Sequence, residues 1–367
     1  MKKLLFFIIL ASFFIACGNR SNIKITGNVE AGIANGDSLY LINIAHDGTV
    51  KTLASCAVEN NIFKLEGNID APAICNIVTY NKQGRVSRNI DIIAEGEPLN
   101  VTVLRDYARV TGSPLNEELQ CFNDSVTLTK KLYQLYYDKK AHNPTLSAKA
   151  VEEADKVMQV TALHHRSMVY RAIERNINNI VGLHIIKNNF SILEPSEAIG
   201  FIESLPDEHK NDYLIEYMYK YYQAVVKYAV GSSYADFVLQ DSTGTDNYLS
   251  GSVGRNKPVV VSLWASDNIR AINELDSLKH LSEEYTDKLS FIGVSIDTNR
   301  KQWLAAIQRV NPVGKQLTDF KGWQNAVLSI YGIYQIPYYI LIDKNGIIDY
   351  RGIELKELIE HIDKLCK

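Results

Sequence analysis

The chain has 367 residues, of which 46% are hydrophobic and 22% are charged, and its formal net charge is −3. This composition supplies enough apolar material for a packed core, and the length suits two or three domains. The small negative charge and the lack of a lysine and arginine cluster exclude the basic surface that nucleic-acid binding requires.

The first residues are typical of an export signal. Lys2 and Lys3 precede an apolar run over residues 4–14, which is too short to span a bilayer but suits the core of a signal peptide over residues 1–16. The run ends in "FIAC", which resembles the lipobox of bacterial lipoproteins. The resemblance implies lipidation of Cys17 and a protein anchored to a membrane on the periplasmic side of the cell envelope. The alternative is an ordinary secretory signal in which Cys17 is incidental.

Residues 22–113 are predicted to form an antiparallel β-sandwich. Eight short runs of alternating polarity occupy this region, and short strands at such regular spacing are typical of a sandwich. The turn residues that separate them are Asn35-Gly36, Asp47-Gly48, Asn60-Asn61, Gln83-Gly84 and Glu95-Gly96.

Residues 114–230 are predicted to form a helical connector. Near residues 111–119 the hydrophobic period changes from alternation to positions three and four apart, which indicates helices. Five residues fall on one face of the last predicted helix, and we expect this stripe to be packing surface rather than a stacking site for sugars. The stripe consists of Leu214, Tyr217, Tyr221, Val225 and Tyr228.

Residues 231–367 alternate strands and helices and therefore predict a three-layer α/β domain. The run "PVVVSLW" lacks alternation, as a strand covered on both faces should. The "DKNG" turn adds an antiparallel hairpin at the edge of the sheet. Helices are expected over residues 268–286, 300–310, 321–331 and 354–366. The whole chain is thus an α+β multidomain protein.

Four segments of this last region resemble the thioredoxin superfamily, in particular TlpA/ResA-type thiol–disulfide oxidoreductases and their AhpC/TSA-related, peroxiredoxin-like relatives. The resemblance implies a thioredoxin-like fold for residues 231–367. The layout of the whole chain also resembles Gram-negative lipoproteins with an N-terminal β domain of unknown function and a helical connector. The four segments are "YADFVLQDSTG", "KPVVVSLWAS", "FIGVSIDTNRKQW" and "YGIYQIPYYILIDKNGIIDYRG".

The chain departs from this family where the catalytic cysteines belong. Active relatives carry a CxxC motif directly after the strand, and its thiolate is the attacking species. Here Trp264 is followed by "ASDNIR", a turn two residues shorter, and residues 231–365 contain no cysteine. No catalytic residue is therefore predicted. Ser266 and Asp267 lack a neighbouring histidine or lysine in sequence that would activate them, so we expect them to act as N-caps of the following helix.

The second family landmark is present. Pro337 matches the proline that is cis in relatives, where the backbone of the preceding residue pairs with an extended substrate peptide. The resemblance implies a site at Trp264, Asp267, Ile336 and Pro337 that binds an extended peptide or an envelope protein by strand addition. The alternative is that Pro337 persists only as an element of the fold.

The remaining cysteines suggest no metal site and no cofactor. None of the four is spaced as CxxC, and no cluster of cysteine and histidine occurs. The sequence permits a disulfide between Cys56 and Cys75, although buried free thiols are the favoured interpretation.

Three functions remain. The favoured one is a redox-inactive, lipid-anchored binding or scaffold module of the cell envelope. The second is a thiol–disulfide oxidoreductase that uses non-standard cysteines such as Cys56 and Cys75. The third is a structural envelope protein in which the β domain and the helical connector mediate assembly.

Overall fold

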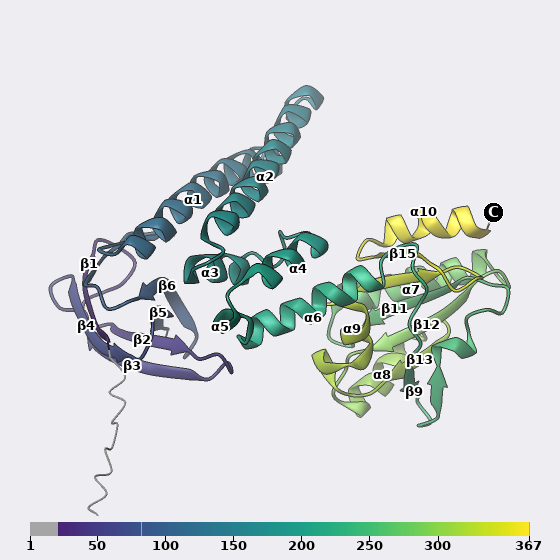
Figure 1. The fold of residues 1–367 in the computed structure, drawn as a ribbon. Coiled ribbons are helices and arrows are strands. Elements are labelled where there is room, and N and C mark those ends of the chain that lie inside the picture. The colour runs from purple at the N-terminus through teal and green to yellow at the C-terminus, as the bar shows by residue number, and fades with distance from the viewer. Residues whose placement is uncertain (1–20, 82, 367) are drawn as a thin grey trace, which may run out of the picture. The chain divides into compact units, whose positions relative to one another are not determined.

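The computed structural model describes residues 21–81 and 83–366, so the expected signal peptide and Cys17 lie outside the described residues. The chain divides into two compact units, and each is described by itself (Figure 1). The first unit contains residues 1–192 and 204–213, and the second contains residues 193–203 and 214–367.

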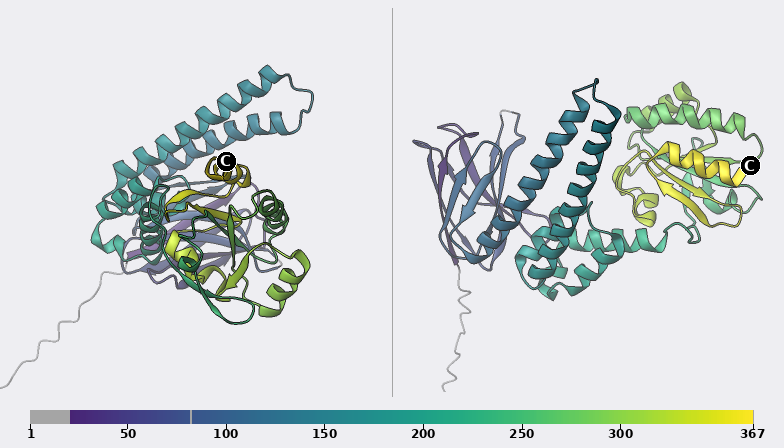
Figure 2. Two further views of the ribbon diagram at one scale, coloured as in Figure 1. Left: turned by 90° about the vertical axis from the view of Figure 1, so that its right-hand side faces the viewer. Right: turned by 90° about the horizontal axis from the view of Figure 1, so that it is seen from above.

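The first unit begins with a β-sandwich of two four-stranded sheets, ordered β4-β1-β7-β8 and β3-β2-β5-β6. All eight predicted strands are present, and the two sheets face each other across one apolar core (Figure 2). The pairs are antiparallel except that β1 and β7 run parallel. The strands are β1 (Ser21–Val29), β2 (Ser38–Ile44), β3 (Val50–Ala57), β4 (Ile62–Ile69), β5 (Ala73–Tyr80), β6 (Val86–Ala94), β7 (Leu99–Val103) and β8 (Ala108–Thr111).

The predicted turns are confirmed by their backbone. Gly36 and Gly48 have φ values of 88° and 85°, and Asn60 and Asn61 have values of 52° and 62°. Positive φ is the left-handed region that glycine and asparagine tolerate best. These residues therefore reverse the chain where the hydrophobic alternation stops.

Helices complete the first unit and are anchored to the sandwich. Ser113 caps the first helix by accepting a hydrogen bond from the Asn116 N–H. The Asn116 side chain bonds both backbone groups of Ile93 in β6, at 2.9 and 2.6 Å. This pairing satisfies a buried amide and fixes the helix start on the sheet. The helices are α1 (Pro114–Ala141), α2 (Ala148–Asn176), α3 (Ile180–Asn188) and α5 (Asp207–Lys210).

The second unit is built on a seven-stranded mixed sheet ordered β10-β9-β13-β12-β11-β14-β15. The central strands β11, β12 and β13 are parallel, and the predicted hairpin of β14 and β15 forms an antiparallel edge. The strands are β9 (Val238–Gln240), β10 (Asp246–Tyr248), β11 (Val259–Trp264), β12 (Ser290–Ser295), β13 (Lys315–Thr318), β14 (Tyr338–Ile342) and β15 (Ile348–Gly352).

Helices cover both faces of this sheet, as the three-layer prediction requires. Residues of α7, α8 and α10 share one core with one face, and residues of α9 share a second core with the other face. The helix predicted over residues 321–331 is wrong in its first half, because a 3-10 turn ends at Gln324 and the Asn325 side chain caps a new helix. The helices are α4 (Pro195–Ser204), α6 (Tyr213–Lys227), α7 (Ile269–Glu284), α8 (Arg300–Val310), α9 (Ala326–Tyr331) and α10 (Leu355–Cys366).

Helix α6 packs on the α/β domain through its aromatic stripe. The ring centroids of Tyr221 and Tyr334 lie 5.6 Å apart, and those of Tyr228 and Tyr331 lie 5.3 Å apart. Gly332 has positive φ, and a side chain there would meet the backbone of α6. Tyr221, Val225 and Tyr228 of the stripe are thus packing surface as predicted, whereas Tyr217 is 52% exposed and the buried residues of α6 are Ile215, Met218 and Tyr222.

Candidate functional site

The candidate site lies where β11 ends and α7 begins. The N-cap of α7 is Asn268, whose Oδ1 accepts a hydrogen bond from the Ala271 N–H at 2.9 Å. The expectation that Ser266 or Asp267 caps this helix is therefore wrong. Asp267 is exposed, while Ser266 is held by another partner.

Ser266 is bound to a carboxylate at the end of the neighbouring strand. The Ser266 hydroxyl donates to Asp297 Oδ1 at 2.6 Å, and the Ser266 N–H reaches both carboxylate oxygens at 3.2 Å. The Ser295 hydroxyl donates to Asp297 Oδ2, also at 2.6 Å. Asp297 is only 8% exposed, and these bonds satisfy its buried charge. The network fixes the turn, and among the described residues the Ser266 hydroxyl bonds this carboxylate rather than a histidine or lysine base.

Asn268 also joins the start of α7 to the proline loop. Its Nδ2 donates to the Ile336 carbonyl oxygen at 3.2 Å, and the Ile336–Pro337 peptide bond is cis. Pro337 is buried and Ile336 is half-buried. Within residues 21–81 and 83–366, no acceptor bonds the Ile336 N–H. The structure therefore brings together the turn and the proline that the family resemblance pointed to, through a residue that the prediction omitted.

An apolar surface flanks this contact. Ile269, the first residue of α7, is 78% exposed, and Tyr334 is 43% exposed. Ile269 follows Asn268 in the chain, and Tyr334 precedes Ile336 by two residues, with its ring edge to face against Tyr221 of α6. We call Ile269, Tyr334 and Ile336 the loop surface. A large apolar side chain exposed to this degree at a helix start is a candidate contact residue.

Trp264 does not belong to this surface. It is 1% exposed, and its indole N–H donates to Gln316 Oε1 at 3.1 Å. The ring packs in the core between the sheet and α7. Of the four residues predicted for the site, Asp267 and Ile336 reach solvent, Pro337 shapes the loop, and Trp264 holds the strand.

Within the described residues of the second unit, no cysteine lies at the start of α7. Cys366 lies near Lys288, with its Sγ 4.0 Å from that carbonyl oxygen. Lys288 follows the C-terminal end of α7, whose 16 residues span about 24 Å. The cysteine of α10 therefore sits at the opposite end of the helix from Asp267.

The two sandwich cysteines are free thiols. Cys56 pairs across β2 with Leu39, while Cys75 pairs with Asn43 on the other side of the same strand. The two positions on β2 are separated by roughly 13 Å at the usual strand rise, so no disulfide joins these cysteines. Burial raises the pKa of Cys75 to about 12 and also raises the pKa of Cys56, which is opposite to the depressed pKa of a reactive thiol.

Within the described parts of the chain, no group of three or more histidine, cysteine, aspartate or glutamate residues is arranged to hold a metal ion. Among the same residues, no helix has the length and apolar character needed to cross a bilayer.

Comparisons with known proteins find a family model that matches the N-terminal region and another that matches the C-terminal region. Residues 23–119 match the model of a domain of unknown function, DUF4369, and residues 256–348 match a thioredoxin-like family model. Together with the mixed sheet and its two helical layers, the second match shows that the C-terminal domain is thioredoxin-like. No curated protein matches the chain.

Solved structures resemble the same C-terminal region. A domain from Bacteroides thetaiotaomicron, provisionally named as part of a thiol-disulfide oxidoreductase, is 27% identical over 38% of this chain and 97% of its own, with a TM-score of 0.36. A thiol-disulfide oxidoreductase from Bacteroides fragilis is 27% identical over 36% of this chain and 99% of its own, with a TM-score of 0.35.

Proposed function

We propose that this protein is a redox-inactive binding module of the bacterial cell envelope, built on a thioredoxin-like domain and anchored through a lipid on Cys17. The observation that carries the proposal is the chemistry at the start of α7. Residues 231–365 contain no cysteine, and the helix start holds Asn268 as a cap instead.

Without the two cysteine thiols the domain keeps the thioredoxin-like fold but has no group for thiol–disulfide exchange at the start of α7. A thiolate at a helix N-terminus is stabilised by free amide donors and by the helix dipole. Here the Asn268 side chain accepts a hydrogen bond from one of those donors, the Ala271 N–H, and donates one to the Ile336 carbonyl oxygen. A neutral amide at this position stabilises the fold but supplies no nucleophile, and function resides in the site rather than in the fold.

The loop surface supports binding of an extended polypeptide. The unpaired Ile336 N–H offers one backbone hydrogen bond to an added strand. Ile269 and Tyr334 offer apolar contact on either side. A segment with an alternating apolar residue would pair with Ile336 and cover Ile269, which removes exposed apolar surface from water.

The absence of redox chemistry is tested by an insulin-reduction assay. We expect the purified protein to give only background rates. The matched positive control replaces Asp267-Asn268-Ile269 by Trp-Cys-Gly-Pro-Cys, which restores the two missing residues and both thiols. Turnover by the unaltered protein at the rate of the restored variant would falsify the proposal.

Binding at the loop surface is tested with fluorescent, unstructured peptides that contain apolar residues. We expect saturable binding that Ile269→Lys reduces at least tenfold, because the lysine charge cannot be buried against an apolar peptide. Trp323→Lys is the matched control, since Trp323 is also exposed, at 59%, but lies outside the loop surface. Equal binding by both variants would argue against this site.

The envelope location is tested by metabolic labelling with a fatty acid. Label is expected on the protein and is expected to disappear in Cys17→Ala. A protein that is exported without acquiring label would show that residues 1–16 act as an ordinary secretory signal.

A further inference from the structure

The first unit contains a cavity that the proposed function does not use. Its volume is about 660 Å³, within the range of roughly 300–1,000 Å³ typical of small-ligand sites. The turn between β2 and β3, the turn between β4 and β5, helix α3 and residues 208–212 all contribute to its walls. All of these segments belong to the first unit.

Part of the cavity lining is apolar. Its side chains come from strands of both sheets, from a turn and from α3, so the apolar lining depends on the packed unit rather than on one element. Such a lining favours a ligand with an aliphatic part. The apolar residues are Ile44, Leu53, Ile69, Pro72, Ile180 and Leu183.

Ionisable side chains also line the cavity, and two of them, Lys187 and Asp212, form a pair that is largely out of solvent, whereas the His46 side chain is 68% exposed. The Asp212 side chain is 5% exposed and accepts a 2.7 Å bond from Lys187 Nζ, whose side chain is 17% exposed. His46 Nδ1 lies 3.9 Å from the same carboxylate. His209 is 12% exposed, and burial lowers its pKa, so its imidazole is neutral at neutral pH. Burying such groups is costly, and their convergence in one cavity is typical of a ligand site.

The charges of the wall restrict the ligand. Lys51 and Lys187 are cationic, while Asp70, Glu208 and Asp212 are anionic. Lys187 and Asp212 neutralise each other as a pair, while Lys51, Asp70 and Glu208 are exposed. A ligand that carries one charge of each sign and an aliphatic side chain meets a group of opposite sign for each charge as well as the apolar lining.

We propose that this cavity binds a short zwitterionic peptide with aliphatic side chains. The peptide carboxylate pairs with Lys51, its free amine pairs with Glu208, and its side chains lie against the apolar lining. Glu208 is suited to this role because its side chain is 79% exposed and its contact with His209 is long, at 3.9 Å.

The test uses the full protein and isothermal titration calorimetry with three probes: Ala-Leu-Ala, its N-acetylated form and its C-amidated form. We expect saturable binding of Ala-Leu-Ala and at least tenfold weaker binding of each capped form, because each cap removes one charge. Glu208→Gln should weaken the free peptide and leave the N-acetylated form unchanged. Glu152→Gln on the exposed side of α2 is the matched control.

A second variant tests the place of binding without disturbing buried charges. Ala71 is exposed at the cavity mouth, so Ala71→Trp should fill the mouth and abolish binding of all three probes. Ala34→Trp, in another exposed turn, should bind normally. Equal affinity for capped and free peptides, no binding of any probe, or binding that survives Ala71→Trp would each overturn the proposal. Binding that survives Ala71→Trp but is lost in Ile269→Lys would place the peptide at the loop surface instead and support the proposed function alone.

Discussion

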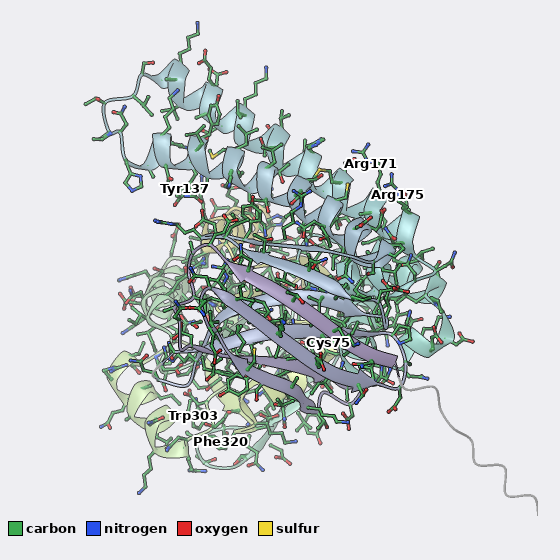
Figure 3. The ribbon with its side chains drawn as sticks, turned by 90° about the vertical axis from the view of Figure 1, so that its left-hand side faces the viewer. Cys75, Tyr137, Arg171, Arg175, Trp303 and Phe320 are labelled. Carbon is green, nitrogen blue, oxygen red and sulfur yellow. The ribbon has the colours of Figure 1, made fainter. Side chains whose placement is uncertain are left out.

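Trp303 is the largest buried side chain with an unpaired polar atom. It is fully buried on α8 and meets Phe320 edge to face, with ring centroids 5.4 Å apart (Figure 3). Among the described residues its indole N–H has no hydrogen-bond partner, and an unsatisfied buried donor costs about 1–3 kcal/mol. We expect Trp303→Phe to leave the free energy of unfolding within about 1 kcal/mol, whereas Trp303→Ala should lower it by about 3–5 kcal/mol. Urea denaturation measures both, and equal losses would show that the N–H is bonded in solution.

The cysteines differ in the reactivity that their surroundings allow. Cys75 lies fully buried among the strands of the sandwich (Figure 3), and burial raises its pKa to about 12 because the thiolate is disfavoured there. It therefore stays protonated from pH 7 to pH 9, and we expect no alkylation of Cys75 in the native protein over that range. Cys121 is exposed on α1 and should react first. Mass spectrometry of iodoacetamide-treated protein measures both sites. Labelling of Cys75 at the rate of Cys121 would show that the sandwich opens.

At the scale of elements, the start of α7 depends on one side chain. Asn268 caps the helix and bonds the Ile336 carbonyl oxygen. Asn268→Ala removes both interactions and should lower the free energy of unfolding by about 1–2 kcal/mol. Asn268→Asp keeps the cap and places a negative charge at the helix N-terminus, which is favourable, so its loss should be smaller. Thermal unfolding ranks the two variants, and a larger loss for aspartate would mean that repulsion between its carboxylate and the Ile336 carbonyl oxygen outweighs the gain from the cap.

The elements that the sequence predicts well are those whose signals are local. The eight sandwich strands follow from alternation and from turn residues with positive φ. Strand β13 lacks such a local signal, because "KQLT" is short and mostly polar. Its Gln316 is buried only because the side chain bonds Trp264 and the Val313 carbonyl oxygen. Those partners belong to the folded chain and leave no trace in the local pattern.

The candidate site shows the same limit. Its place, at the turn before α7 and at Pro337, follows from the family resemblance. The roles of its residues do not, because Trp264 points into the core and Asn268 takes the cap that was expected of Ser266 or Asp267. An asparagine three residues before Ala271 is a local capping signal. Its bond to Ile336, 68 residues away, could be found only in the fold.

At the scale of the whole molecule, the second unit begins before the residues that its sequence resemblance covers. The thioredoxin-like match starts at residue 256, but the unit includes residues 193–203 and 214–230. Tyr222 of α6 is 1% exposed. Arg351 in β15 donates to the Tyr228 carbonyl oxygen at 2.7 Å and also to the Tyr331 carbonyl oxygen. The guanidinium thus caps the C-terminal ends of α6 and α9 together.

A fragment of residues 231–367 should therefore be less stable than one of residues 193–367. Without α6 and Tyr228 it loses the contact of Tyr221 with Tyr334 and the Arg351 bond to Tyr228, while Tyr331 loses its contact with Tyr228 and becomes exposed. Each large apolar side chain that loses its burial removes about 1.5–3 kcal/mol, so we expect a loss of at least about 3 kcal/mol in the free energy of unfolding. Guanidinium denaturation of the two fragments measures the difference, and binding of an apolar dye to the shorter one should reveal the uncovered face. In the 193–367 fragment, Arg351→Met should cause part of the same loss of stability, because it removes the hydrogen bonds to the Tyr228 and Tyr331 carbonyl oxygens while leaving α6 in place. Equal midpoints for all three proteins would show that α6 is a connector that adds nothing to the thioredoxin-like domain.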